Sequence, residues 1–338
     1  MMTGAATHRM ETNMWRMVLG RAACIAVALC SGAVLAASDY PSKPVKMVVP
    51  MAAGGGTDAV ARVIASKMSD RIGSPIIVEN RAGAGGQLGA EQVASSSADG
   101  YTLLFASSSV MTLPYLRQTR YDLQNDFIPV GQVGVGGFVL VLRPGLNHKT
   151  LAEFMADAKA NPGKFTFGSP GIGSAGHLAL NLLKAKTGIE MVHVPFKSST
   201  EIVNALIGGQ IDCAIDIVTI EKPYIEAGKV RALATTTAKR DPSLPDLPTF
   251  NELKAVPGGY EITFWYGMFV PRATPPDAVA RLQKAFATVA QEPEITERLE
   301  HLSLVRSSLS PAQFEENIAA DIKTWRKIIE DNNLSTSQ

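Results

Sequence analysis

The chain has 338 residues, of which 46% are hydrophobic and 19% charged, and its formal net charge is +1. A length of this order favours about two domains, and the composition is that of an ordinary globular protein, not of a disordered, collagen-like or coiled-coil chain. The near-neutral charge, without a long basic run, argues against a protein that binds by neutralising many phosphates. No nucleic-acid partner is expected.

Residues 1–36 have the pattern of a secretory signal peptide. Arg16 and Arg21 precede an uncharged stretch at 22–35, and small residues end the segment at Ala36. The stretch is shorter than the ~20 residues that a membrane-spanning helix needs. We therefore expect export with cleavage after Ala36.

Cysteine usage agrees with this interpretation. Cys24 and Cys30 lie in the predicted signal peptide, so Cys213 alone remains after cleavage and no internal disulfide is expected. We predict Cys213 to be a buried apolar residue. Leu29 precedes Cys30 where a lipoprotein signal has a small residue, so no lipid anchor is expected.

The rest of the chain repeats one supersecondary pattern. A β-branched strand begins at residue 45, and a glycine-rich turn and a helical apolar stripe follow it. Thr57 is predicted to cap this helix, and Asp58 in its first turn complements the positive end of the helix dipole. Further strands are predicted at 76–79 and 101–106.

The same order recurs later in the chain. A strand at 164–169, a glycine-rich turn at 170–176 and a helical stripe are followed by strands at 191–195 and 211–218. Strands that alternate with helices pair in parallel through crossovers. The recurrence predicts an α/β protein with two similar Rossmann-like domains.

Two extended runs, at 130–142 and 260–270, predict that the chain crosses between these domains twice. We therefore place domain 1 at 37–138 plus 262–338 and domain 2 at 139–261.

Two closing helices are readable from their first residues. Thr274 with Pro275 is predicted to start one, and Ser310 with Gln313 forms a capping box at the start of the other. The apolar residues of the last helix are predicted to be core: Phe314, Ile318, Ile322, Trp325 and Ile329.

Both glycine-rich turns lie after a strand and before a helix, where open α/β sheets bind ligands. Backbone N–H groups at such a helix start bind anions without any basic side chain. The alternative is that the glycines only permit tight turns. Two turns in matching positions favour anion binding from two sides.

Residues 171–176 read GIGSAG, which fits the dinucleotide fingerprint between a strand and a helix. The acidic residue expected about 20 positions later is missing, because residues 192–195 read VHVP. We therefore favour anion capture by the same amides and expect no cofactor. An exported oxidoreductase that uses this loop is the alternative.

Catalytic and metal signatures are not found in the sequence. No serine lies in a Gly-x-Ser-x-Gly elbow, and His148, His177, His193 and His301 are scattered. We expect no metal site and no enzyme activity. His177 follows the second glycine turn, where it can orient that loop or contact a ligand, and a packed, hydrogen-bonded histidine is the alternative.

Other candidates follow predicted strands. Ser107, Ser108 and Ser109 come after the strand at 101–106 and can donate hydroxyl hydrogen bonds at its carboxyl end. Asp216 has the equivalent place in the second unit, where it can accept from a ligand or stabilise a loop.

Aromatic residues also lie near these strand ends and crossings. Phe196, Phe264, Trp265 and Tyr266 can bring aromatic surface to a cleft, or they can pack between the domains.

Short segments in chain order carry a family resemblance. They read PMAAGGGTDAVAR at 50–62, NRAGAGG at 80–86, DGYTLL at 99–104, GSPGIGS at 168–174, HVPFK at 193–197, RALA at 231–234, PT at 248–249 and WYG at 265–267. In this order they resemble the Bug family, the extracytoplasmic solute receptors of tripartite tricarboxylate transporters. The match covers nearly all of the chain after the predicted signal.

The resemblance implies a type II periplasmic-binding-protein fold whose two domains close on a small organic carboxylate, such as a dicarboxylate, citrate, an acidic amino acid or an aromatic acid. It implies a periplasmic location, integral-membrane transporter subunits as partners, and contacts from 51–57 and 169–174. The chain departs from the family at Met51, where Phe is usual, and at Ser198, where Gly commonly follows Lys. The predicted ligand-binding residues are Met51, Ala52, Ala53, Gly54, Gly55, Gly56, Thr57, Asp58, Ser107, Ser108, Ser169, Gly171, Gly173, Ser174, His177, Phe196, Lys197 and Asp216.

This set contains no arginine and only Lys197 as a basic residue. Burying a third carboxylate without a cationic partner costs several kcal/mol. We therefore favour a mono- or dicarboxylate over citrate, with aromatic acids still open. A receptor that reports to a sensor protein is an alternative to a transport receptor.

Overall fold

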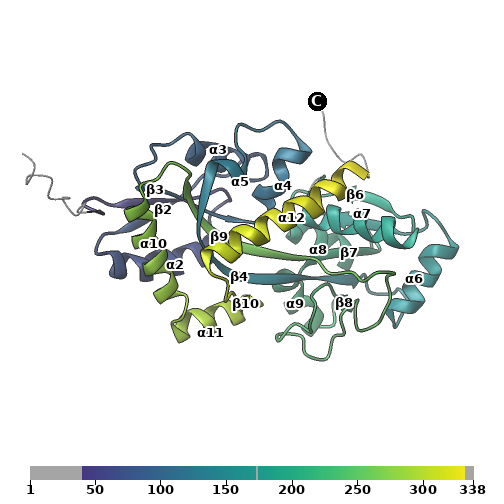
Figure 1. The fold of residues 1–338 in the computed structure, drawn as a ribbon. Helices are drawn as coiled ribbons and strands as arrows, with labels where there is room; N and C mark the ends of the chain where they lie inside the picture. Colours follow the sequence, from purple (N-terminus) through teal and green to yellow (C-terminus); the bar gives the residue numbers. More distant parts are fainter. Residues whose placement is uncertain (1–39, 173, 332–338) are drawn as a thin grey trace, which may run out of the picture. The chain divides into compact units, whose positions relative to one another are not determined.

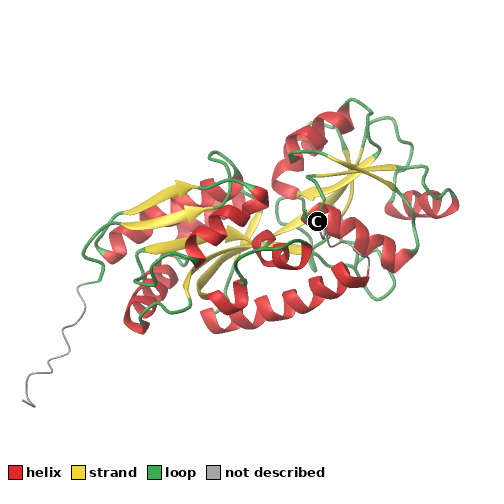
Figure 2. Ribbon diagram, turned by 90° about the horizontal axis from the view of Figure 1, so that it is seen from above, coloured by secondary structure: helices red, strands yellow, loops and turns green. Residues whose placement is uncertain are grey.

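Parallel strands joined by helices form two halves of the structure (Figures 1 and 2). The computed structural model describes residues 40–172 and 174–331, so the predicted signal peptide and Gly173 lie outside the described residues. The strands are β1 (Val45–Val49), β2 (Ile76–Asn80), β3 (Thr102–Ser107), β4 (Phe127–Leu142), β5 (Thr166–Ser169), β6 (Val192–Pro195), β7 (Cys213–Ile217), β8 (Arg231–Thr235), β9 (Thr263–Pro271) and β10 (Leu304–Arg306).

Helices follow most of these strands and pack on them (Figure 2). They are α2 (Gly56–Ile72), the 3-10 turn η1 (Ala84–Gly86), α3 (Gln87–Ala94), α4 (Ser109–Leu116), α5 (Leu123–Asp126), α6 (Leu151–Ala160), α7 (Ala175–Thr187), α8 (Ser199–Ile207), α9 (Val218–Glu226), α10 (Pro276–Val289), α11 (Pro293–His301) and α12 (Pro311–Asp331). We call β1–β3, β9 and β10 with their helices the first half, and β5–β8 with theirs the second half. In the part of the chain that the structure describes, no helix combines the length and the apolar character that crossing a membrane requires.

The strand order repeats between the halves, as the sequence predicts. The first half has the order β2-β1-β3-β9-β4, and the second has β6-β5-β7-β4-β8. In each half the first three strands are parallel and the next strand is antiparallel. The β-α-β units therefore correspond element for element, with small shifts at the strand ends.

Strands β4 and β9 are the two predicted crossings. β4 pairs with β9 from Phe127 to Gly137 and with β7 from Phe138 to Leu142, so one strand belongs to both halves. The predicted boundary at 138/139 falls inside β4, and the domain limits stay a prediction.

Each half has its own apolar core. Trp265, Phe269 and Phe314 pack in the first, and Val139, Ile202 and the neighbours of β7 pack in the second. Helix α12, yellow in Figure 1, packs against β4, α4 and α7. Its apolar residues confirm the core prediction, because Phe314, Ile318, Ile322 and Ile329 are buried and Trp325 is half-buried against them. Cys213 is also buried, as predicted.

The helix starts confirm one predicted cap and correct two. The Ser310 N–H donates to Gln313 Oε1 at 2.9 Å and the Gln313 N–H donates to Ser310 Oγ at 3.3 Å, so the capping box is present. Thr57 does not cap α2, because the helix begins at Gly56 with Gly55 as its N-cap. Thr274 does not cap α10 either: Pro275 is the N-cap, and the Thr274 hydroxyl has no hydrogen-bond partner among the described residues.

Candidate functional site

The two glycine-rich turns occupy equivalent places in the repeated fold. One joins β1 to α2 and the other joins β5 to α7. Each turn needs a glycine in the left-handed region, Gly54 at φ +83° and Gly171 at φ +108°. Because a helix N-terminus presents unpaired N–H groups with partial positive charge, both turns have the local geometry for an anion.

Asp58 organises the first turn. Its carboxylate accepts from the Gly54 N–H at 2.9 Å, from Arg62 Nε at 3.0 Å and from Asn80 Nδ2 at 2.9 Å. The hydrogen bond from Arg62 lowers the pKa of Asp58 to about 2 against the opposing effect of burial, with Gly54 and Asn80 adding to it. The predicted ligand contact of Asp58 does not fit this geometry, because both carboxylate oxygens already have internal partners.

The rest of the first turn is accessible. Met51 is half-buried, and its carbonyl accepts from Asn80 Nδ2 at 3.1 Å. The predicted residues that follow it are exposed: Ala52, Ala53, Gly54, Gly55 and Gly56. The ion pair between Asp58 and Arg62 therefore fixes a loop whose backbone is open to solvent.

Thr57 is buried and hydrogen-bonds the hydroxyl of Tyr266. A small cavity of about 60 Å³ lies beside this pair, lined by Gly56, Tyr266, Ile217 and Thr219 among others. Tyr266 comes from β9, and the sequence prediction named it among the aromatic residues that can line a cleft or pack between the domains. Phe264 and Trp265 are buried packing residues.

Ser107 and Ser108 lie at the carboxyl end of β3, which pairs with β1. Ser107 Oγ is 2.8 Å from Ser109 Oγ, and the Ser108 N–H donates to the Trp265 carbonyl at 2.9 Å. Both predicted residues are half-buried, so each keeps some access to solvent.

Ser169 anchors the second turn from below. It is fully buried, and its Oγ lies 3.1 Å from the Gly171 carbonyl and 2.6 Å from His193 Nε2. Ser174 is the N-cap of α7, and its Oγ accepts from the His177 N–H at 3.3 Å. These contacts tie the start and the end of the turn to the fold beneath it.

His177 is packed against His193, with their ring centroids 4.3 Å apart. Burial, together with the charges of His193 and Lys184, lowers the pKa of His177 from 6.5 to about 4. Burial also lowers the pKa of His193. His177 is thus the packed, hydrogen-bonded histidine of the alternative interpretation, and His193 is a functional candidate that the sequence prediction missed.

Two predicted residues follow β6. Phe196 is half-buried, its N–H donates to the Ser169 carbonyl at 2.9 Å, and its ring packs on the second core. Lys197 is exposed, and its N–H donates to Glu201 Oε2 at 3.0 Å. Lys197 thus extends from the segment that follows β6, and β6 pairs with β5, the strand that leads into the second turn.

Asp216 is buried below this segment instead of lining a surface. Its Oδ1 accepts from Ser199 Oγ at 2.9 Å and from the Ile217 N–H at 2.8 Å, while Oδ2 has no partner among the described residues. Glu221 is also fully buried, and both of its carboxyl oxygens are unpartnered there. Burial raises the pKa of Asp216 to about 6, and burial with the nearby Asp216 raises that of Glu221 to about 8.

The predicted ligand contact of Asp216 therefore does not fit the structure, because this side chain is 2% exposed.

The glycine that completes the dinucleotide fingerprint has a packing role. A Cβ at Gly176 would lie 2.7 Å from the Ile215 carbonyl oxygen, so α7 approaches β7 only because this residue is glycine. Within residues 40–172 and 174–331, no three His, Cys, Asp or Glu side chains gather where a metal ion could bind.

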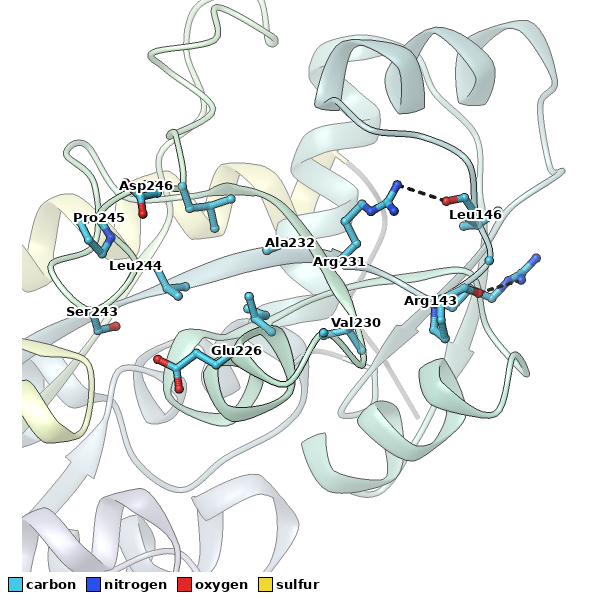
Figure 3. Close-up of a pocket in the computed structure, with 15 residues that line it drawn as sticks. Arg143, Leu146, Glu226, Val230, Arg231, Ala232, Ser243, Leu244, Pro245 and Asp246 are labelled. Carbon is cyan, nitrogen blue, oxygen red and sulfur yellow. Dashed lines mark hydrogen bonds between the residues drawn. The ribbon is translucent and has the colours of Figure 1, made fainter.

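A separate pocket of about 710 Å³ lies in the second half, near the end of β4 (Figure 3). Its two arginines have internal partners: Arg143 pairs with Asp212 at 2.8 Å, and Arg231 donates to the His148 carbonyl at 2.9 Å. None of the predicted ligand-binding residues lines this pocket. It therefore gives no support to a second carboxylate site.

Residues 60–334 match the tripartite tricarboxylate transporter family receptor, TctC. The chain belongs to this family. The solved structure of the periplasmic binding protein BugD is similar to it, with 33% identity, a TM-score of 0.76, and coverage of 88% of this chain and 99% of BugD.

An R. palustris protein solved with adipate is 33% identical, has a TM-score of 0.77, and is matched over 87% of this chain and 98% of that one. MatC from Rhodopseudomonas palustris, solved with malate, is 30% identical with a TM-score of 0.73, over 86% of this chain and all of MatC (100%).

These findings confirm the resemblance to the Bug family and the α/β fold with type II periplasmic-binding-protein architecture. The TctC-family chain is a solute-binding receptor, in a family of periplasmic binding proteins whose solved members include carboxylate complexes.

Proposed function

We propose that this TctC-family receptor captures a small mono- or dicarboxylate between its two glycine-rich turns and delivers it to the membrane subunits of a tripartite carrier. One observation carries the proposal: each half contributes an equivalent strand, turn and helix start that can bind an anion with backbone N–H groups. Two such turns can bind the two ends of one ligand. Aromatic acids belong to the same ligand class and stay in the test.

The charges near the turns support a ligand with few carboxylates. Lys197 is the exposed cation of the predicted set, Arg62 is engaged by Asp58, and Asp216 is buried below the second turn. A third buried carboxylate without a cation costs several kcal/mol. Adipate and malate, found in the two R. palustris structures, are both dicarboxylates, which supports the same preference.

Thermal unfolding with a ligand panel tests this function. The panel contains adipate, malate, succinate, benzoate, glutamate and citrate, with NAD as the control for the oxidoreductase alternative. A ligand at about 100 times its dissociation constant adds roughly 2.7 kcal/mol, and each kcal/mol raises Tm by about 2–4 °C in a chain of this size. A rise with a mono- or dicarboxylate supports the proposal, and a larger rise with citrate or NAD contradicts it.

A matched pair of glycine variants locates the ligand. Gly171→Ala forces a left-handed φ on alanine in the second turn, and Gly188→Ala does the same at the C-cap of the same helix. Each substitution costs about 1–3 kcal/mol of backbone strain. We expect weaker ligand binding in Gly171→Ala alone, and equal affinity in the two variants would contradict ligand binding at this turn.

The export pattern at 1–36 and the family support the proposed location and delivery. N-terminal sequencing of the exported protein should give Ala37 as the first residue. Uptake of the bound carboxylate should require both this receptor and its membrane subunits. A receptor needed for a transcriptional response but not for uptake would support the sensor alternative instead.

A further inference from the structure

The hydrogen bonds of Ser169 at the second turn determine which ring nitrogen of His193 carries a proton. Ser169 Oγ lies 3.1 Å from the Gly171 carbonyl oxygen and 2.6 Å from His193 Nε2. A serine hydroxyl has one proton, and a carbonyl oxygen only accepts. Both contacts are hydrogen bonds at the same time only when Ser169 donates to Gly171 and His193, with its proton on Nε2, donates to Ser169.

The Gly171 carbonyl is also engaged from the other side of the turn. The Ser174 N–H donates to it at 3.2 Å, and the Phe196 N–H donates to the Ser169 carbonyl at 2.9 Å. The carbonyl thus points inward, toward buried Ser169. Because a trans peptide is planar, its N–H points opposite to its C=O, so the Ile172 N–H points outward.

The residue that carries this N–H lies at the surface. Ile172 is 56% exposed, while Ser169, at the base of the turn, is fully buried. The orientation of the amide of this exposed residue therefore depends on a chain of polar groups that runs from half-buried His193 through buried Ser169 to Gly171.

We propose that His193 is a positioning residue for ligand capture: through Ser169 it fixes the Gly171–Ile172 peptide so that the Ile172 N–H faces the ligand carboxylate. The proposal rests on the proposed function and adds a residue to it. His193 acts from β6, beneath the turn, and does not contact the ligand itself.

The neighbouring histidine stabilises this arrangement. Asn181 Nδ2 donates to the His177 carbonyl at 2.9 Å and lies 3.2 Å from His177 Nε2, so that nitrogen is an acceptor. A neutral His177 ring then packs against His193 at 4.3 Å. The proximity of Ser169 to His193 is not a nucleophile pair, because Ser169 is fully buried and its proton is directed at the Gly171 carbonyl.

Three variants separate positioning from packing. His193→Leu removes the Nε2 donor, Ser169→Ala removes the link, and His193→Gln provides an amide N–H at a similar distance from the backbone. We expect His193→Leu and Ser169→Ala to bind adipate or malate about tenfold more weakly, as loss of an orienting hydrogen bond implies. His193→Gln should retain affinity within about threefold, which loss of ring packing alone would not allow.

His148→Leu is the matched control. His148 is also a partly buried histidine of the second half, where Nε2 lies 2.9 Å from Asp157 Oδ2, away from the turn. It should lower stability without a change in affinity. Equal affinity of His193→Leu and wild type would overturn the proposal.

The ring nitrogens give a readout that needs no ligand. Nitrogen NMR of the free protein should show His193 as the Nε2–H tautomer, and Ser169→Ala should change the chemical shift and exchange rate of the Ile172 amide. An Nδ1–H tautomer of His193, or an unchanged Ile172 amide, would overturn the positioning role. Absence of any carboxylate binding by the wild type would instead count against the proposed function, while the tautomer still decides the role of His193.

Discussion

The two glycine-rich turns have equivalent positions in the fold, but side chains of different chemistry support them. Asp58 and His177 are each the third residue of the helix that follows the turn. Asp58 is an ionised carboxylate bound by Arg62 and Asn80, whereas His177 is a ring packed on His193 whose low pKa keeps it neutral. The repeated fold thus conserves the position of the backbone and not the charge that supports it.

The hydrogen bonds at the two helix starts run in opposite directions. In α7 the side chain of the N-cap Ser174 accepts from the N–H of His177. In α2 the N-cap is glycine, and the side chain of Asp58 accepts from the N–H of Gly54. Helix α7 therefore has one half of a capping box, in which the N-cap side chain accepts from the third helical N–H. In α2 the third helical residue instead binds the N–H of Gly54, which precedes the N-cap Gly55, so this bond holds the turn and not the helix start.

The largest expected effect comes from breaking the charged support. Asp58→Ala leaves Arg62 without its carboxylate and the Gly54 N–H without its acceptor. Loss of one partner of a largely buried ion pair costs about 3–5 kcal/mol, and because the Arg62 side chain is 52% exposed we expect about 2–3 kcal/mol. Urea unfolding measures the change.

The control for this variant is Asp277→Ala. Asp277 is also an acidic residue in the first turn of a helix, but it is exposed. Its loss should cost under about 1 kcal/mol, the usual contribution of a charge to the helix dipole. Similar losses for both variants would show that Asp58 acts only on the dipole and does not organise the turn.

The next effect tests the close approach in the second half. Gly176→Ala places a Cβ 2.7 Å from the Ile215 carbonyl oxygen, a backbone atom that cannot rotate away. Such overpacking costs about 1–3 kcal/mol and shifts α7. At Gly56, in the first turn of α2, the nearest atom is the Tyr266 hydroxyl at the longer distance of 3.2 Å, so Gly56→Ala should change the unfolding free energy by less than about 1 kcal/mol. A reversed order of the two losses would contradict this account.

These contacts show what the sequence could predict. Strand, glycine turn and helix follow one another locally, so the repeat, both turns and the Ser310 capping box were readable from spacing. The hydrogen bonds between Tyr266 and Thr57 and between His193 and Ser169 were not, because each joins segments that lie apart along the chain. The internal hydrogen bonds of Asp58 and Asp216 were not readable for a related reason: their partners, Asn80 and Ser199, meet them only in the folded chain. The motif HVPFK, which contains His193, was the available signal.

Raising the pH should reveal the effect of the buried carboxyl groups of Asp216 and Glu221 on stability. Burial raises the pKa of Glu221 from 4.5 to about 8. Between these values the folded chain binds a proton that the unfolded chain has released, so the unfolding free energy falls as pH rises from about 4.5 to about 8. Glu221→Gln removes this proton uptake. We expect the variant to be more stable than wild type at pH 9 and closest to it near pH 5, and a constant difference across this range would contradict a buried neutral Glu221.

Lowering the pH should destabilise the second turn before the first, and this is the smallest of the expected effects. The pKa of His177 is lowered from 6.5 to about 4, so the unfolded chain binds a proton that the folded chain excludes, and stability falls as pH decreases from about 6.5 to about 4. Asp58, with its pKa lowered from 3.8 to about 2, contributes stability that is lost only as pH falls below about 3.8. Acidification to pH 4.5 therefore stresses the second turn and leaves the first intact.

His177→Phe tests this difference, because it keeps an aromatic ring against His193 and removes the titrating group. Chemical unfolding at pH 7.5 and pH 4.5 should show a smaller acid-induced loss of stability in the variant than in wild type. Hydrogen exchange should show that in wild type the amides of 169–177 lose protection at pH 4.5 before those of 51–58. If acid lowers the stability of both proteins equally, the pair of His177 and His193 does not determine the acid stability of the second turn. The difference between the charged Asp58 and the neutral His177 would then have no consequence for stability.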